Sequence, residues 1–159
     1  MDKEIEKKLL SFDYEERKSA LKILKRKIEK EEIKKIDDKP YLNLHIHSFH
    51  SFNYKNWSPS RIVFEGWRNN LKYVGIVDFD TLIATEEALL SGEILNVNTI
   101  SGFESRVFLS ELKEKVINSP KEPGIYYLCG KGFKKNLKEN SEEEKFFLKL
   151  KEIAQERNK

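Results

Sequence analysis

Residues 41–108 alternate three strand-like segments with two helical ones, and this order constrains the fold more than any other feature of the sequence. Residues 41–47 alternate apolar and polar side chains, a period of two that is typical of a β-strand. Residues 72–77 are nearly all apolar, as expected of a parallel strand that is covered on both faces. The short connections favour a parallel sheet or an incomplete barrel of β/α units with right-handed crossovers.

Capping residues mark where several of the predicted helices begin and end. Ser58-Pro59 gives an N-cap followed by proline at the first helical position, which predicts a helix start. A further helix is expected over residues 82–91, with Gly92 closing it. Ser141-Glu142-Glu143-Glu144 has the form of a capping box and opens a last amphipathic helix.

Two amphipathic helices are predicted over residues 3–34, before the first strand. The second begins at Asp13-Tyr14-Glu15-Glu16, which also has the form of a capping box. Asp37-Asp38-Lys39-Pro40 interrupts the helix, because proline disfavours helical geometry in the residue before it. We therefore divide the chain into an N-terminal helical extension at 1–38 and an incomplete α/β domain at 39–159.

The composition is that of a single globular domain with a heavily solvated surface. The 159 residues include 38% hydrophobic and 36% charged residues, with a formal net charge of +3. The two signs of charge are interleaved, which argues against a nucleic-acid partner. With no visible signal peptide and no apolar run long enough to span a bilayer, the sequence predicts a cytoplasmic protein without a membrane partner. The single cysteine, Cys129, excludes an intrachain disulfide. It could ligate a metal, but it is expected to be a buried structural thiol.

Side chains that carry chemistry lie near the ends of the three predicted strands. All three histidines fall in one short stretch, and strand alternation places His45 and His47 on the same face. Asp78 and Asp80 follow the second strand, and Glu104 lies near the start of the third. Because sites in α/β folds are built where parallel strands end, these side chains are expected to gather there. Imidazole nitrogens and carboxylate oxygens together form a ligand set for Zn, Mn or Fe.

Each of these residues also has a simpler interpretation. His45 and His47 can be polar residues on an exposed strand, or one of them can be satisfied in the core. Asp78 and Asp80 can be helix N-caps, and Glu104 can be a surface residue. Their joint placement at one edge of the predicted sheet is what favours the metal site.

Three segments of the chain have the order and spacing of a known set of motifs. The first is His45-Ile46-His47-Ser48 with Ser51 three residues on, the second is Gly75-Ile76-Val77-Asp78-Phe79-Asp80-Thr81, and the third is Gly102-Phe103-Glu104. They resemble the motifs of the PHP (polymerase and histidinol phosphatase) family, which read His-x-His-Ser/Thr-x-x-Ser, Gly-Ile-x-Asp-His-Asp-Thr and Gly-x-Glu. The resemblance covers about residues 41–108.

This resemblance implies a distorted β/α barrel with metal ions at the C-terminal ends of its strands, and a metal-dependent hydrolysis of phosphoesters. It implies that the two histidines of the first segment bind the first ion and that Glu104 bridges the first and second ions. Asp78 or Asp80 would assist catalysis. Arg106, two residues beyond Glu104 on the same face of the strand, would contact a phosphate. The implied substrate is a phosphorylated small molecule.

The departures from these motifs reduce the number of ions that we expect. Phe79 stands where the second motif has a metal-binding histidine, and Phe52 and Asn53 stand where the first motif commonly adds an acid or a histidine. The chain has no histidine after His50. We therefore expect one divalent ion, and at most two.

The chain also has too few β/α units for a full barrel. It is expected to be either the front part of a longer protein or a naturally shortened, degenerate member of the family. The C-terminal helix can cover the part of the sheet that the missing β/α units would bury. Alternatively, a second copy of the chain or another subunit can complete the barrel. A metal-dependent phosphoesterase is the predicted function, and a non-catalytic interaction or metal-binding module is the alternative.

Overall fold

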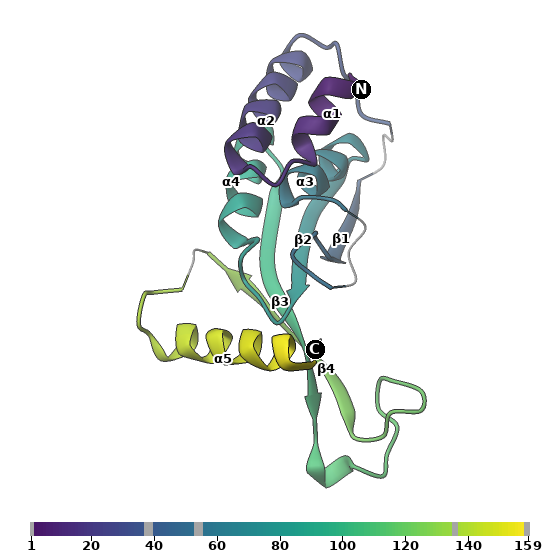
Figure 1. Cartoon of the computed structure of the whole chain (residues 1–159). Coiled ribbons are helices and arrows are strands. Elements are labelled where there is room, and N and C mark those ends of the chain that lie inside the picture. Colours follow the sequence, from purple (N-terminus) through teal and green to yellow (C-terminus); the bar gives the residue numbers. More distant parts are fainter. Residues whose placement is uncertain (1, 37–39, 53–55, 135–136, 158–159) are drawn as a thin grey trace.

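The computed structural model describes residues 2–36, 40–52, 56–134 and 137–157. Its elements follow the predicted β-α-β-α-β order in the middle of the chain (Figure 1). They are α1 (Lys3–Leu9), α2 (Tyr14–Glu29), β1 (Tyr41–Ile46), α3 (Pro59–Arg68), β2 (Leu71–Phe79), α4 (Thr85–Leu95), β3 (Asn98–Phe108), a 3-10 turn (Ser110–Leu112), β4 (Ile125–Phe133) and α5 (Glu142–Arg157). Among the described residues, no helix is both long and apolar enough to cross a bilayer.

The four strands form one curled sheet in the order β1-β2-β3-β4, which makes a half-barrel (Figure 1). β1 pairs with β2 in parallel, and β2 pairs with β3 in parallel, because a helix crosses over between the members of each pair. β4 follows β3 without a helical crossover and pairs with it in antiparallel orientation. The predicted α/β class with a mostly parallel sheet is therefore confirmed.

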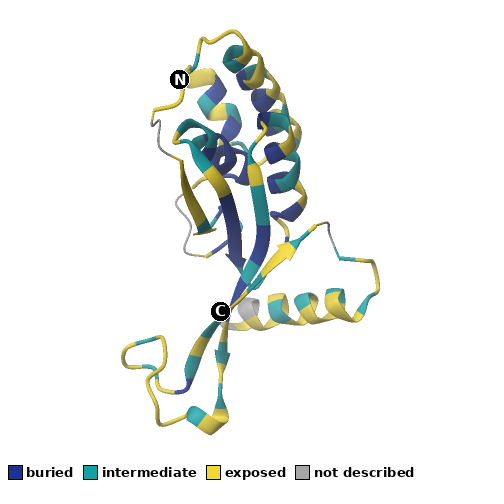
Figure 2. Ribbon diagram, turned by 180° about the vertical axis from the view of Figure 1, so that it is seen from behind, coloured by how far each residue is buried: buried dark blue, intermediate teal, exposed yellow. Residues whose placement is uncertain are grey.

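The two faces of the sheet differ in what they contact. Val74 and Ile76 of β2 project toward the helices and are at most 1% exposed. The core on that face also contains apolar side chains from four helices, namely Ile5, Leu9, Ala20, Leu21, Leu24, Ile62, Val63, Phe64, Ala88 and Leu95. Because side chains alternate along a strand, residues such as Phe79 project to the opposite, concave face. Figure 2 shows the buried residues concentrated in β2, β3 and the helices, while β1 is largely exposed.

The N-terminal helices share this core with α3 and α4. Ser58, at the start of α3, donates its hydroxyl hydrogen to the Leu9 carbonyl oxygen at 2.5 Å. Arg61 of α3 forms an ion pair with Glu6 of α1 at 3.1 Å. The predicted division of the chain at residue 38 falls in residues 37–39, which lie outside the described residues.

The structure confirms one predicted helix boundary and corrects another. Ser58 accepts a hydrogen bond from the Arg61 N–H at 3.0 Å, with proline in the first turn, as its N-cap role requires. The prediction that Gly92 closes the next helix is wrong, because α4 continues to Leu95 and ends at Asn96 in a left-handed conformation with φ 54°. A Cβ on Gly92 would lie 2.4 Å from the Thr99 Oγ1, so this glycine permits the close packing of α4 on β3.

The helix predicted to reach residue 34 ends earlier. α2 stops at Glu29, and Glu31 then takes a left-handed conformation with φ 58°. At its start, the Asp13 side chain accepts hydrogen bonds from the backbone N–H groups of Glu15 and Glu16, as predicted. In a capping box the Glu16 side chain would accept a hydrogen bond from the Asp13 N–H. Here the Asp13 N–H donates to the Ser11 hydroxyl oxygen instead.

β3 and β4 continue beyond the end of β2 as a two-stranded arm. The pairing of β2 with β3 ends at Glu104, whereas the pairing of β3 with β4 continues to Phe108 and Ile125. Figure 1 shows this arm extending away from the helices. The arm carries exposed apolar side chains at Phe108, Tyr126 and Leu128.

Candidate metal centre

Three side chains from two strands meet on the concave face of the sheet. These are His45 in β1, His47 directly after the last residue of β1, and Glu104 in β3, and their ligand atoms all lie within 4.8 Å of one another. The Glu104 Oε2 is 2.9 Å from the His45 Nε2 and 3.2 Å from the His47 Nε2. Ligand atoms around a tetrahedral ion with bonds of about 2.0–2.1 Å are separated by about 3.3 Å. The three residues predicted as metal ligands are therefore brought together at a spacing that suits a single metal ion.

The sheet explains why these residues converge although Glu104 is far from the histidines in the sequence. His45 and His47 are two residues apart, so both project from the same face. β2 lies between their strand and β3, and its last residue, Phe79, is the register partner of Glu104. The Glu104 side chain is 9% exposed and that of His45 is 46% exposed, so the cluster is open to solvent on the side of His45.

Ser51 orients the more buried of the two imidazoles. Its hydroxyl oxygen lies 3.2 Å from the His47 Nδ1 and accepts a hydrogen bond from the Phe79 N–H at 3.2 Å. A partner at Nδ1 fixes the ring and leaves Nε2 for a metal ion. Burial lowers the pKa of His47, against the opposing effect of Glu104, and this favours the neutral ring that a metal ligand requires. Ser51 belongs to the first motif, three residues after Ser48, so the sequence carries a signal for this positioning residue.

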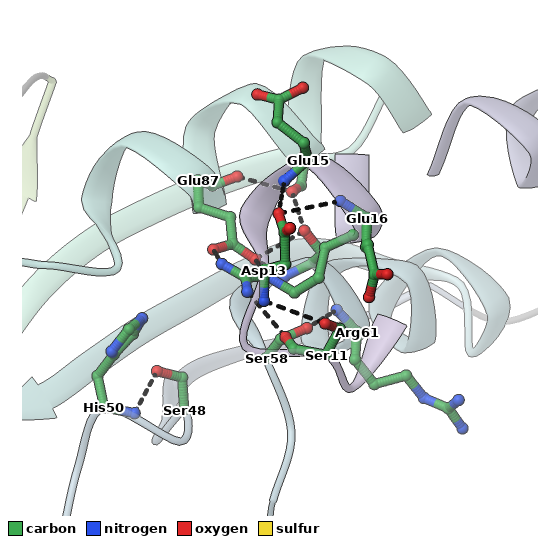
Figure 3. Close-up of polar contacts among 12 residues, drawn as sticks. Ser11, Asp13, Glu15, Glu16, Ser48, His50, Ser58, Arg61 and Glu87 are labelled. Carbon is green, nitrogen blue, oxygen red and sulfur yellow. Dashed lines mark hydrogen bonds and ion pairs between the residues drawn. The ribbon is translucent and has the colours of Figure 1, made fainter. Parts of the chain in front are cut away.

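Asp78 lies outside the three-residue cluster, on the helix-facing side of β2. Its carboxylate accepts hydrogen bonds from the Ser48 N–H at 2.5 Å and from the Ser48 hydroxyl at 2.6 Å. The Ser48 oxygen in turn accepts from the His50 N–H at 3.2 Å (Figure 3). Because Ser48 directly follows His47, Asp78 positions the segment that carries this imidazole. The catalytic role predicted for Asp78 stays a prediction.

Asp78 should also impose a pH dependence on stability. Burial raises the pKa of its carboxyl from 3.8 to about 6, against the hydrogen bonds from Ser48, which lower it. Between these two values the folded state binds more protons than the unfolded state, so the free energy of unfolding falls as the pH rises through this window. A difference of about two pKa units corresponds to roughly 3 kcal/mol.

Asp78→Asn is expected to remove this contribution, because the amide does not titrate while its oxygen can still accept from Ser48. Chemical denaturation of both proteins at about pH 4 and about pH 7 measures it. The free energy of unfolding at about pH 7 minus that at about pH 4 should be more positive in Asp78→Asn than in the original protein, by up to roughly 3 kcal/mol. An unchanged difference would contradict the raised pKa.

The side chains of Asp80 and Arg106 pair with residues outside the three-residue cluster of His45, His47 and Glu104. The Asp80 side chain accepts a hydrogen bond from the Ser105 hydroxyl at 2.6 Å, and its N–H donates to the Glu104 carbonyl oxygen at 2.8 Å. Arg106 forms an ion pair with Glu122 at 2.5 Å. Alternation along β3 places Arg106 on the same face as Glu104, although the two side chains have different partners. The catalytic roles of Asp80 and Arg106 stay predictions.

Cys129 is exposed, so the prediction of a buried thiol is wrong. It is the register partner of Glu104 across the antiparallel pair of β3 and β4, and such partners project from the same face. Desolvation and the charge of Glu104 raise the pKa of the Cys129 thiol. A neutral thiol therefore lies beside the candidate metal centre.

Phe79 borders His47 and is itself in contact with two further rings, and we call Phe52, Phe79 and Tyr127 the aromatic cluster. The Phe79 ring stacks on the His47 ring at 4.9 Å with an interplanar angle of 6°. Phe52 lies 4.7 Å from Phe79, and Tyr127 meets Phe79 edge-on at 5.9 Å. From the sequence we interpreted Phe52 and Phe79 only as lost metal ligands. We missed Tyr127, because the pairing of β4 with β3 brings it to the site.

Comparison with known proteins gives no relative from which to infer the function. No model of a known protein family matches the chain, and no curated protein matches it.

Proposed function

We propose that this chain is a metal-dependent phosphoesterase of the PHP type, acting on a phosphorylated small molecule. The observation that carries the proposal is the convergence of His45, His47 and Glu104, with all ligand atoms within 4.8 Å. Two imidazoles and one carboxylate suit Zn, Mn or Fe, and they leave positions open for a substrate oxygen and for water. A bound ion of this kind polarises a phosphate and lowers the pKa of water.

The residues of the chain would hold and orient the reacting groups. Ser51 fixes the His47 ring, and the bond between Asp78 and Ser48 holds the segment that follows it. Arg106 lies farther along β3 on the same face as Glu104. Its planar guanidinium can bind a phosphate through two hydrogen bonds once its ion pair with Glu122 is broken. A second copy of the chain or another subunit would complete the half-barrel and supply the ligands of a second ion.

A non-catalytic metal-binding module is the alternative function, and specific contacts favour it. The carboxylate of Asp78 is directed to Ser48, that of Asp80 to Ser105, and Arg106 to Glu122. Phe79, whose ring cannot bind a metal, covers one face of the His47 ring. In this case the chain would bind one ion and act through a partner without turnover.

Metal analysis combined with hydrolysis of p-nitrophenyl phosphate in Mn²⁺ tests these functions. We expect the purified chain to bind one ion and to hydrolyse the ester. His47→Ala is expected to lower both metal affinity and rate by at least about 100-fold, because a ligand is lost, while His50→Gln, outside the cluster, retains both. Metal binding without turnover would support the module. Absence of metal binding would overturn both functions.

A further inference from the structure

The aromatic cluster is assembled by the fold and exposed at its edge. Phe52 follows β1, Phe79 ends β2 and Tyr127 lies in β4, so the rings come from three separate segments. Phe52 is 72% exposed although its ring lies 4.7 Å from Phe79. A single exposed aromatic side chain is common in proteins. An exposed ring that is continuous with two further rings beside a candidate metal centre is instead a candidate ligand-binding surface.

The aromatic cluster adjoins the metal centre through His47. The Phe79 and His47 rings are nearly parallel at 4.9 Å, and the His47 Nε2 lies 3.2 Å from Glu104. Phe79 is also the register partner of Glu104 in the neighbouring strand. A group covalently attached to a phosphate at the metal centre is therefore within reach of these rings.

We infer that the aromatic cluster binds a planar aromatic group of the substrate while the metal centre holds its phosphate. This inference rests on the proposed function, and it narrows the substrate to phosphoesters whose alcohol carries an aryl or heteroaryl ring. Phe52, Phe79 and Tyr127 are the residues that determine this specificity. His45, His47 and Glu104 bind the anionic end.

The geometry favours a planar ring over a saturated one of similar size. Aromatic rings carry negative charge on their faces and positive charge at their edges, so they prefer offset-stacked or edge-on partners. The rings of the cluster already show both arrangements, with Phe79 stacked on His47 and Tyr127 edge-on to Phe79. Such pairs favour an aromatic ligand by roughly 3- to 10-fold in affinity beyond the effect of buried area.

Phenylphosphonate and cyclohexylphosphonate test this preference without any hydrolysis. Both carry the same anionic group, and they differ in the planarity and electron distribution of the ring. Isothermal titration calorimetry of the full chain loaded with Mn²⁺ is expected to give roughly 3- to 10-fold tighter binding of phenylphosphonate. Equal affinities, or no binding of either compound, would overturn the inference.

Phe52→Leu separates aromatic recognition from simple apolar contact. Leucine keeps an apolar side chain at this exposed position, so the fold should be retained and the preference for phenylphosphonate should fall to less than about 2-fold. The matched control is Phe146→Leu, which changes a phenylalanine of α5 that is 53% exposed and should keep the preference. If Phe52→Leu keeps the preference for phenylphosphonate, the same titrations are made with the double variant Phe52→Leu/Tyr127→Leu. A preference that is retained in the double variant would overturn the inference.

Benzyl phosphate and cyclohexylmethyl phosphate distinguish this inference from the proposed function. Both release a primary alcohol, so their chemical reactivity is similar and the ring is the main difference. If both esters are hydrolysed with equal kcat/KM and the two phosphonates bind with equal affinity, the proposed phosphoesterase function is supported and the inference of aromatic recognition is overturned. A phosphonate preference without hydrolysis of either ester would support aromatic recognition and reject the phosphoesterase.

Discussion

Replacing Arg17 with methionine is expected to lower the free energy of unfolding by about 3–5 kcal/mol, because it leaves a buried carboxylate without its charged partner. Arg17 is 4% exposed and Glu87 is 6% exposed. The guanidinium donates from Nε to the Glu87 Oε1 at 2.8 Å and from Nη2 to the Glu87 Oε2. Urea denaturation of the variant and of the original protein measures the difference.

Lys18→Met is the matched control, since it changes the next residue of the same helix. Lys18 lies 3.7 Å from Glu15 in an ion pair whose carboxylate is 75% exposed, so its loss should change stability by less than about 1 kcal/mol. A similarly small change in Arg17→Met would contradict the role given to the buried pair. The double variant Arg17→Met/Glu87→Leu should be less destabilised than Arg17→Met, because no unpaired charge remains.

The buried pair joins segments that are distant in the sequence. Glu87 also accepts hydrogen bonds from the Ser60 N–H at 3.0 Å and from the Ser60 hydroxyl at 2.8 Å, and Arg17 donates to the Ser11 carbonyl oxygen at 2.8 Å. Figure 3 shows Glu87 near the start of α2, where Asp13 caps the helix. The pair therefore links α2 to α3 and α4.

The same guanidinium contacts the segment that follows the two histidines of the candidate metal centre. Its central carbon lies 5.3 Å from the centre of the Phe49 ring, and Phe49 stands between Ser48 and His50. Ser48 is in turn held by Asp78. The N-terminal helices thus support the position of His47 from the side opposite to Glu104.

Glu104→Gln is expected to lower the affinity of the chain for a divalent metal ion by at least about 100-fold. A neutral amide is a much weaker ligand than a carboxylate for a divalent ion, and Glu104 is the residue through which β3 takes part in the cluster. Competition with a chelator of known affinity measures the loss. Glu122→Gln is the control, because it removes a carboxylate that pairs with Arg106 and should leave metal affinity within about 3-fold of the original.

Thermal unfolding with and without metal gives a second readout of the same change. Saturation at about 100 times Kd stabilises a protein by about 2.7 kcal/mol. This gain should be present in Glu122→Gln and absent in Glu104→Gln. Equal gains in the two variants would show that the ion binds elsewhere.

The sequence predicted the features that depend on local patterns. Alternation over residues 41–47 predicted β1 and the shared face of His45 and His47. The short connections predicted that β1 pairs with β2 and β2 with β3 in parallel. Glu104 was grouped with the histidines because the polar residues of the three predicted strands were expected to gather at one edge of the sheet. These predictions succeeded because strand period and crossover geometry are set by short stretches of chain.

Other features depend on long-range packing, which local patterns do not specify. Residues 74–77 are all apolar or glycine, so no alternation indicates that Asp78 faces the helices while Phe79 faces the concave side. Arg17 and Glu87 are 70 positions apart, and neither lies in a motif. Tyr127 reaches the aromatic cluster through the antiparallel pairing of β4, which the β-α-β pattern does not include.

The position of the metal centre within the sheet has a mechanical consequence. β1 is an edge strand with little burial, whereas β3 is internal and paired on both sides. An ion bound to His45, His47 and Glu104 would bridge these two strands across β2 and oppose fraying of the edge. Loss of the ion would then loosen β1 before the rest of the sheet, so occupancy of the centre would control how firmly the half-barrel keeps its curvature.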